Sequence, residues 1–199
     1  MYINESIKKY LDELGARQPT PGGGSAAALA GALGAALLEM VCNFTIGNKK
    51  YSNVEQDVIG YLSSVTKIRE EFMALVDEDA KVYSAINAAF KTKDEKTIDN
   101  ALKDGYHISL KICRLSRSCA EIAINLSEKG NTNLISDVGC AAELVKASFS
   151  SGIFNCEINL KSIKENLFAE KERMVLKALK KDMDELCKKA LTKTQERML

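Results

Sequence analysis

The stretch Pro19-Thr20-Pro21-Gly22-Gly23-Gly24-Ser25 decides how the first part of this chain folds. It holds the only two prolines of the 199 residues, and an uncharged run of Ala, Leu and Gly follows from Ala26 to Leu38. Proline fixes φ, lacks an N–H and pushes the preceding residue toward extended geometry. The backbone is therefore expected to be non-helical before Ser25 and helical after it, over about residues 26–46.

The glycine loop and the helix after it together suggest a ligand site. Ser25 is a favoured helix N-cap, and a helix beginning there directs free N–H groups and a positive dipole end toward the loop. The glycines allow a ligand to approach bare backbone. An anion or a developing negative charge is the natural ligand. A long loop before a buried helix, with no ligand, explains the same residues equally well.

Composition and charge exclude several classes of protein. The 28 basic and 27 acidic residues give a net charge of +1, which offers no electrostatic footprint for nucleic acid. The N-terminus has neither the basic nor the apolar region of a signal peptide. The apolar run from Ala26 reaches Glu39 before the roughly 20 residues that a membrane span needs. We therefore expect a cytoplasmic protein with one domain over 1–199, without a nucleic-acid or membrane partner.

The cysteines and the single histidine do not form a metal or nucleophile motif. None of the six cysteines lies in a C-x-x-C pair, and His107 is the only histidine. Zinc-binding spacing and a G-x-S-x-G turn are both absent. We expect reduced, mostly buried thiols and no metal site.

Apolar residues recur at helical spacing along nearly the whole chain, and no strand-like alternation appears. The sequence therefore predicts an all-α bundle of about six helices with long central helices. In the second helix a small-residue stripe, Ala27, Gly31 and Ala35, permits close approach of another helix, and we expect a homodimer. The expected elements are a short helix over 7–14, the helix over 26–46, long helices over 54–90 and 97–126, a helix over about 137–151, a connection over 152–160, and a last helix capped by Ser162 whose tail from Lys188 frays.

Three consecutive acidic residues, Asp77-Glu78-Asp79, interrupt the pattern of apolar residues in the first long helix. Residues two apart point about 200° apart on a helix, so the two aspartates do not share a site. Asp79 shares a face with Leu75 and Tyr83, and a carboxylate there has a movable pKa that suits a general acid or base. We expect Asp79 to face inward, and Asp77 and Glu78 to be solvated.

Other polar groups have both structural and functional explanations. Lys49 and Lys50 follow a helix C-terminus, where lysines are favourable, and they also suit a carboxylate-bearing ligand. Asn131 and Asp137 are typical turn and cap residues. Asn155 and Asn159 lie in an apolar context in which an amide needs a partner.

Five blocks in this order resemble the cyclodeaminase/cyclohydrolase family. That family forms the C-terminal half of formiminotransferase-cyclodeaminase and also occurs as a free-standing bacterial protein. The blocks are Pro21-Gly-Gly-Gly-Ser25, Gly47-Asn-Lys-Lys-Tyr51, Asp79-Ala-x-x-Tyr83, Gly130-Asn-x-Asn-Leu-x-Ser-Asp137 and Asn155-x-x-x-Asn159-Leu.

The resemblance implies an all-α homodimer whose substrate is a tetrahydrofolate one-carbon derivative, without a metal or a permanently bound cofactor. The family either closes 5-formimino-tetrahydrofolate to 5,10-methenyl-tetrahydrofolate with loss of ammonia, or interconverts the methenyl and 10-formyl forms with water. It implies Asp79 and Lys49 as catalytic residues, with Asp79 as the acid/base. The substrate-binding residues that it implies are Gly22, Gly23, Gly24, Ser25, Lys50, Tyr83, Asn131, Asp137, Asn155 and Asn159.

Two positions depart from the family pattern. Asn48 stands where relatives often carry a lysine, and Ser109 stands where they usually place a proline. The lack of a transferase half favours the cyclohydrolase over the deaminase. The alternative is a non-catalytic helical dimer that binds folate or another pterin, or acts as a scaffold, and the two departures are its best support.

Overall fold

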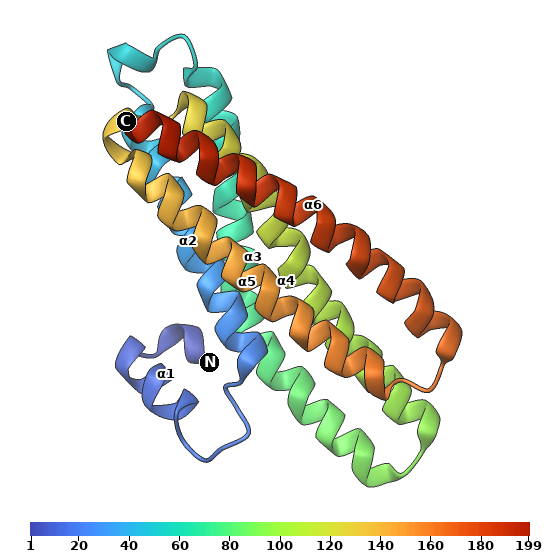
Figure 1. Ribbon diagram of the computed structural model, residues 1–199. Helices are drawn as coiled ribbons and strands as arrows, with labels where there is room; N and C mark the ends of the chain where they lie inside the picture. The colour runs from blue at the N-terminus through green and yellow to red at the C-terminus, as the bar shows by residue number, and fades with distance from the viewer.

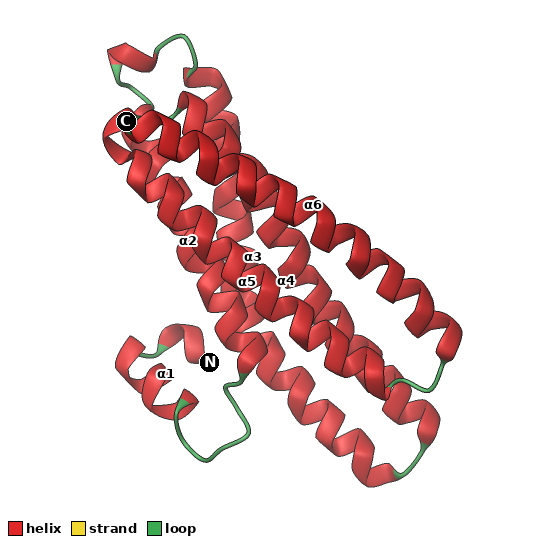
Figure 2. Ribbon diagram, in the orientation of Figure 1, coloured by secondary structure: helices red, strands yellow, loops and turns green.

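Every regular element of the protein is helical (Figure 2), in a computed structural model that describes residues 1–199. The prediction of an all-α bundle of about six helices with long central helices is confirmed. The elements are η1 (Tyr2–Asn4), α1 (Ile7–Leu14), α2 (Gly23–Thr45), η2 (Lys49–Tyr51), α3 (Glu55–Thr92), α4 (Glu95–Lys129), η3 (Thr132–Leu134), α5 (Ile135–Ser162) and α6 (Asn166–Met198), where η marks a short 3₁₀ helix.

Four helices, α2 to α5, pack around one hydrophobic core, and α6 lies along α4 and α5 (Figure 1). The short helix α1 lies beside the bundle, close to the loop that leads into α2. Large side chains such as Phe72, Leu38 and Ile112 fill the centre and are fully buried. The Gly15–Gly22 loop and the η2 turn consequently lie at opposite ends of α2.

The small residues of α2 serve contacts within the chain. A Cβ on Gly31 would lie 2.4 Å from the Phe72 ring of α3, and one on Gly34 would lie 2.6 Å from Val145 of α5. Ala27 and Ala35 are also buried in the bundle. The stripe does allow close approach, but its partners are α3 and α5 of the same chain. It therefore does not carry the expectation of a dimer.

Three boundaries differ from the sequence expectation. Helix α2 begins at Gly23 with Gly22 as its cap, so Ser25 lies in the first turn and is not the N-cap. The connection expected over 152–160 is wrong, because α5 continues to Ser162. The last helix begins at Asn166, after Ser162 rather than at it.

The charged C-terminal tail is helical to Met198 and does not fray in the structure. Cys187, Ala190 and Thr194 are buried on its inner side. Arg197 donates to the carbonyl oxygens of Ser127 at 2.7 Å and Gly130 at 3.2 Å. These contacts with the end of α4 hold the last turns of α6 in place.

All six cysteines are free, and Cys140 alone is exposed. Burial raises the pKa of the Cys42 and Cys119 thiols to about 12 each, so both are neutral at ordinary pH. No group of three or more His, Cys, Asp or Glu side chains is placed to hold a metal ion.

Helix α2 is longer than its first uncharged run, and by length and composition alone it is able to cross a membrane. In its most apolar window 56% of the residues are buried inside the bundle. The core helix of a soluble protein meets the same criteria.

Candidate active site

A cleft of about 290 Å³ opens where the start of α2 meets the middle of α3 and the facing parts of α4 and α5. Apolar side chains, backbone and neutral polar groups form most of its wall. Asp79 is the only charged residue in this lining. Of the sequence-predicted site residues, the cleft brings together Gly22, Gly23, Gly24, Asp79, Tyr83, Asn155 and Asn159, while Ser25 lies just behind its wall.

Asp79 sits against the first turn of α2. The Ser25 backbone N–H donates to Asp79 Oδ2 at 3.0 Å. A Cβ on Gly24 would lie 2.0 Å from Asp79 Oδ1, so only glycine leaves room for the carboxylate. Burial raises the pKa of Asp79 above its ordinary value of 3.8, and the Ser25 hydrogen bond offsets part of this rise. The inward position expected for Asp79 is confirmed.

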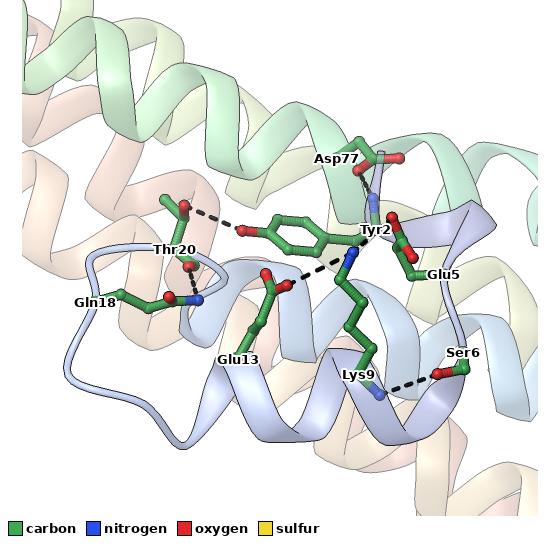
Figure 3. A network of polar contacts seen from close by, with 8 residues as sticks. All are labelled: Tyr2, Glu5, Ser6, Lys9, Glu13, Gln18, Thr20 and Asp77. Carbon is green, nitrogen blue, oxygen red and sulfur yellow. Dashed lines mark hydrogen bonds and ion pairs between the residues drawn. The ribbon is translucent and has the colours of Figure 1, made fainter.

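Asp77 is buried, contrary to the expectation that it is solvated. Only 6% of it is exposed, and its Oδ1 accepts a hydrogen bond from the Tyr2 backbone N–H (Figure 3). Its Oδ2 is buried without a partner. The two aspartates do point apart, as the helix geometry predicts. The N-terminal residues cover the face of α3 that carries Asp77. The helical periodicity of α3 does not predict this contact.

The N-terminal segment braces the glycine loop from behind. The hydroxyl groups of Tyr10 and Ser25 are 3.0 Å apart, and Ser25 is fully buried. The Tyr2 ring meets the Tyr10 ring edge-on. Tyr2 Oη donates to Thr20 Oγ1 at 3.2 Å (Figure 3). Tyr10 thus contacts the side chain of Ser25, the residue whose backbone N–H binds Asp79.

Two asparagines on α5 present acceptors to the cleft. The Nδ2 group of Asn155 donates to the Ser151 carbonyl at 2.9 Å, and that of Asn159 donates to the Asn155 carbonyl at 2.8 Å. A carbonyl oxygen only accepts, so each NH₂ group must face its backbone partner. Both Oδ1 atoms are left for a ligand. The cleft therefore suits a ligand that carries N–H donors or positive charge.

The other predicted site residues lie at the far end of the bundle (Figure 1). Lys49 and Lys50 form η2 after α2 ends, and Asn131 and Asp137 flank the start of α5. The 23 residues of α2 separate the two groups by roughly 33 Å at 1.5 Å per residue. One chain does not bring them to Asp79.

The groups at this far end differ in how the chain uses them. Asn131 Nδ2 donates to the Phe44 carbonyl at 3.0 Å, and its Oδ1 accepts from the Asn133 N–H, so the fold occupies its amide. Lys50 donates to Thr132 Oγ1 at 3.3 Å. Lys49 is exposed and makes no ion pair or hydrogen bond, which leaves its charge free.

The two departures from the family pattern have local roles. Asn48 caps η2 by accepting from the Lys50 N–H at 3.0 Å. Ser109 lines the cleft, and its Oγ donates to the Gly105 carbonyl at 2.9 Å within an unbroken α4. Sequence reasoning missed Gly105 and Tyr10 as parts of the site. Helix packing alone brings them there, and no local motif marks them.

Similarity to known proteins gives evidence on the function of this cleft that is independent of its geometry. The sequence model of the formiminotransferase-cyclodeaminase family matches residues 6–178. The chain belongs to this family. It is 38% identical over 185 residues to the methenyltetrahydrofolate cyclohydrolase of Methylorubrum extorquens, an alignment that covers 88% of this chain and 89% of that protein.

Two further family members show how the domain occurs elsewhere. The rat formimidoyltransferase-cyclodeaminase is 28% identical over 89% of this chain, which spans only 34% of that longer protein. The crystal structure of formiminotetrahydrofolate cyclodeaminase from Thermotoga maritima superposes with a TM-score of 0.93 at 30% identity, over 97% of both chains. The fold is therefore that of a solved family member.

Proposed function

We propose that this protein is a folate one-carbon enzyme that forms or hydrolyses 5,10-methenyltetrahydrofolate. The observation that carries the proposal is the single carboxylate, Asp79, in an otherwise uncharged cleft. The methenyl form carries a positive charge on the carbon between its two nitrogens, and an ionised Asp79 attracts that charge. The cyclohydrolase and cyclodeaminase relatives point to the same chemistry.

In the hydrolytic direction, Asp79 acts first as base and then as acid. Water attacks the methenyl carbon while the Asp79 carboxylate takes one water proton, which forms a neutral carbinol. The bond from this carbon to N5 then breaks as Asp79 returns the proton to N5 and the hydroxyl proton leaves to solvent. The products are 10-formyl-tetrahydrofolate and one released proton. A raised pKa of Asp79 suits both proton transfers.

The cyclodeaminase reaction uses the same carboxyl group of Asp79. N10 attacks the formimino carbon of 5-formimino-tetrahydrofolate, and the N10 proton passes through Asp79 to the departing nitrogen. Protonated Asp79 supplies the further proton with which ammonia leaves, and the methenyl cation remains. We favour hydrolysis as the main activity, because the 38% identical relative is a cyclohydrolase.

The cleft residues around Asp79 hold the folate ring. The Oδ1 atoms of Asn155 and Asn159 accept from ring N–H groups, and Tyr83, which is 42% exposed, offers a face for stacking. Both reactions are proton transfers and bond exchange at one carbon, so we propose that folate is the substrate and that no permanently bound cofactor takes part. Six free cysteines favour a cytoplasmic location.

We also propose that the protein is a homodimer. The outward face of α2 is apolar, with Leu33 51% and Phe44 61% exposed. A helix face in contact with water normally carries polar side chains. A second copy of the chain is the occupant that we assign to this face.

One assay tests the proposed activity. Purified protein is mixed with methenyl-tetrahydrofolate, and the loss of its near-ultraviolet absorbance is compared with the spontaneous rate. Cyclisation of 5-formimino-tetrahydrofolate is followed in parallel as the gain of the same band. We expect acceleration of at least one reaction. No acceleration of either reaction would remove the enzyme proposal.

A further inference from the structure

The polar side chains that α4 and α5 contribute to the cleft share one hydrogen-bonding pattern. Each of the four donates to the backbone carbonyl four residues earlier in its own helix. The donors and acceptors are Ser109 to Gly105 at 2.9 Å, Asn155 to Ser151 at 2.9 Å, Asn159 to Asn155 at 2.8 Å, and Ser162 to Ile158 at 3.4 Å. These four side chains, which we name the acceptor wall, hold their donors against the helix backbone and leave acceptor oxygens for a ligand.

Ser109 is the only buried member of the acceptor wall, with 2% of the residue exposed. A serine hydroxyl carries one proton, and the Gly105 carbonyl engages that of Ser109. Only the lone pairs of Ser109 Oγ therefore remain for a ligand. The ligand must bring a donor to this point, because two buried acceptors that face each other are both left unsatisfied.

Gly105, one turn before Ser109 on α4, leaves room for the amide of Asn159. A Cβ at this position would lie 3.0 Å from Asn159 Oδ1 and 2.9 Å from Ile86 Cδ1. An alanine there consequently pushes the Asn159 side chain out of its place in the cleft. Gly105 is thus a positioning residue for one oxygen of the acceptor wall.

The acid and the free backbone donors lie on the other side of the cleft. The first turn of α2, residues 23–25, has N–H groups without partners inside the helix, and Asp79 accepts one of them. A Cβ on the first residue of this turn would lie 3.8 Å from the Asn155 amide, so the turn separates Asp79 from the acceptor wall. Ser109 lies in the same layer, since a Cβ on Gly152, about one turn before Asn155, would lie 3.4 Å from the Ser109 carbonyl oxygen.

The match to a ligand rests on the proposed function, which brings a pterin ring into the cleft. N5 and N8 lie at opposite corners of one six-membered ring of the pterin. The reaction requires N5 beside Asp79, so N8 points across the cleft toward Ser109. In a tetrahydropterin N8 carries a hydrogen and donates, whereas in a fully oxidised pterin N8 has only a lone pair to offer.

We propose that the acceptor wall selects reduced over oxidised pterins, and that Ser109 is the residue that determines this specificity by accepting from N8–H. Asn155 and Asn159 accept from the 2-amino group on the same side of the ring system. In an oxidised pterin the lone pair of N8 opposes that of Ser109 Oγ. A site built to bond an N–H rejects an analogue that lacks it far more strongly than an apolar pocket does.

The selection is measured without turnover, by anaerobic titration calorimetry with tetrahydrofolate and with folic acid. We expect the wild type to prefer tetrahydrofolate by about a hundredfold or more. Ser109→Ala is expected to bind tetrahydrofolate about tenfold more weakly, as for one lost hydrogen bond, and folic acid no more weakly than the wild type does. Ser127→Ala is the matched control and is expected to change neither affinity. Ser127 is a buried serine of α4 that donates to the Ile124 carbonyl at 2.7 Å, outside the cleft.

A ligand analogue tests the assigned atom. In 8-deazatetrahydrofolate a CH₂ group replaces N8–H, and the ring stays reduced. We expect the wild type to bind this analogue about tenfold more weakly than tetrahydrofolate, and Ser109→Ala to bind the two ligands equally. An equal loss in both proteins would overturn the contact between Ser109 and N8–H.

The positioning role of Gly105 has its own kinetic test. Gly105→Ala is expected to raise KM for methenyl-tetrahydrofolate about tenfold and to change kcat far less, because it displaces a binding group and leaves Asp79 in place. Gly60→Ala is the matched control, since Gly60 also lies inside a long helix and a Cβ there would contact nothing. A fall in kcat with KM unchanged would contradict this role.

The possible failures are distinguishable. A wild type that binds tetrahydrofolate with the expected preference, yet accelerates neither reaction, would sink the proposed function and leave the selection intact. An active wild type that binds folic acid as tightly as tetrahydrofolate, or whose preference survives Ser109→Ala in full, would overturn the selection and leave the proposed function intact.

Discussion

Asp79 is held between two opposing influences, burial and one hydrogen bond. Burial favours its neutral form, and the Ser25 N–H favours the carboxylate, with burial the larger effect. Its folded pKa therefore lies above the unfolded value of 3.8, and the stability that the neutral carboxyl gives is fully present below pH 3.8 and lost as pH rises through the folded pKa.

This sign gives a prediction on stability. Asp79→Asn is expected to raise the melting temperature at pH 7.5, because the variant no longer buries a charge. The gain is expected to shrink as pH approaches 4. Thermal denaturation of both proteins across this range is the measurement. A variant that is less stable than wild type at pH 7.5 would contradict the account of a desolvated carboxylate.

The glycines of the loop differ in what they tolerate. Gly24→Ala places a Cβ against the Asp79 carboxylate and is expected to displace it, with a loss of activity of roughly a hundredfold or more. Gly23→Ala is the matched control, since its Cβ would lie 3.8 Å from the Asn155 amide, at ordinary contact distance. Initial rates and circular dichroism distinguish the two. Equal effects of both substitutions would argue against close packing at Gly24.

At this scale the sequence predicts some residues well and others poorly. The face shared by Asp79 and Leu75 follows from helical spacing, and Asp79 does lie inward. The burial of Asp77 comes from Tyr2, which is 75 positions away. A helical period describes one helix and does not show which other segment covers it.

The elements around the site depend on the N-terminal segment as well as on the bundle. Tyr10 is the only buried residue of α1, and its hydroxyl is the only partner of the buried Ser25 hydroxyl. Tyr10→Phe leaves that hydroxyl unpaired and is expected to cost roughly 1–3 kcal/mol of unfolding free energy. Ser25→Ala in the same chain is expected to restore much of this loss, since it removes both partners.

A denaturant double-mutant cycle measures this coupling. Additive effects of the two substitutions would show that the hydroxyl pair does not link α1 to the first turn of α2.

The sequence predicts that a helix is present more reliably than it predicts where the helix ends. The expected break at 152–160 rests on Gly152 and the asparagines, which are common in turns. In the structure a Cβ on Gly152 would lie 2.8 Å from Cys113 Sγ, so this glycine lets α4 and α5 approach. Asn155 and Asn159 donate to carbonyls one turn earlier inside α5. Glycine and asparagine occur in turns, in helix packing and in ligand contacts. The presence of these residue types in a segment therefore does not show which role they have.

At the scale of the whole molecule, the proposed dimer is expected to depend on the apolar outward face of α2. Phe44→Glu places a charge on this face and is expected to give a folded monomer. Met174→Glu is the matched control, because Met174 is 74% exposed on α6, away from the outward face of α2. Light scattering and circular dichroism are measured on the same samples. A Phe44→Glu variant that stays dimeric would contradict the assignment of a second copy to this face.

The central claim is that Asp79 moves the proton at the methenyl carbon. The most direct test compares wild type with Asp79→Asn for turnover of methenyl-tetrahydrofolate and for folate binding by titration calorimetry. The account predicts a fall in kcat of roughly 10²–10⁴-fold, as for a lost general acid or base, with folate affinity largely kept. Near-normal turnover by Asp79→Asn would contradict it.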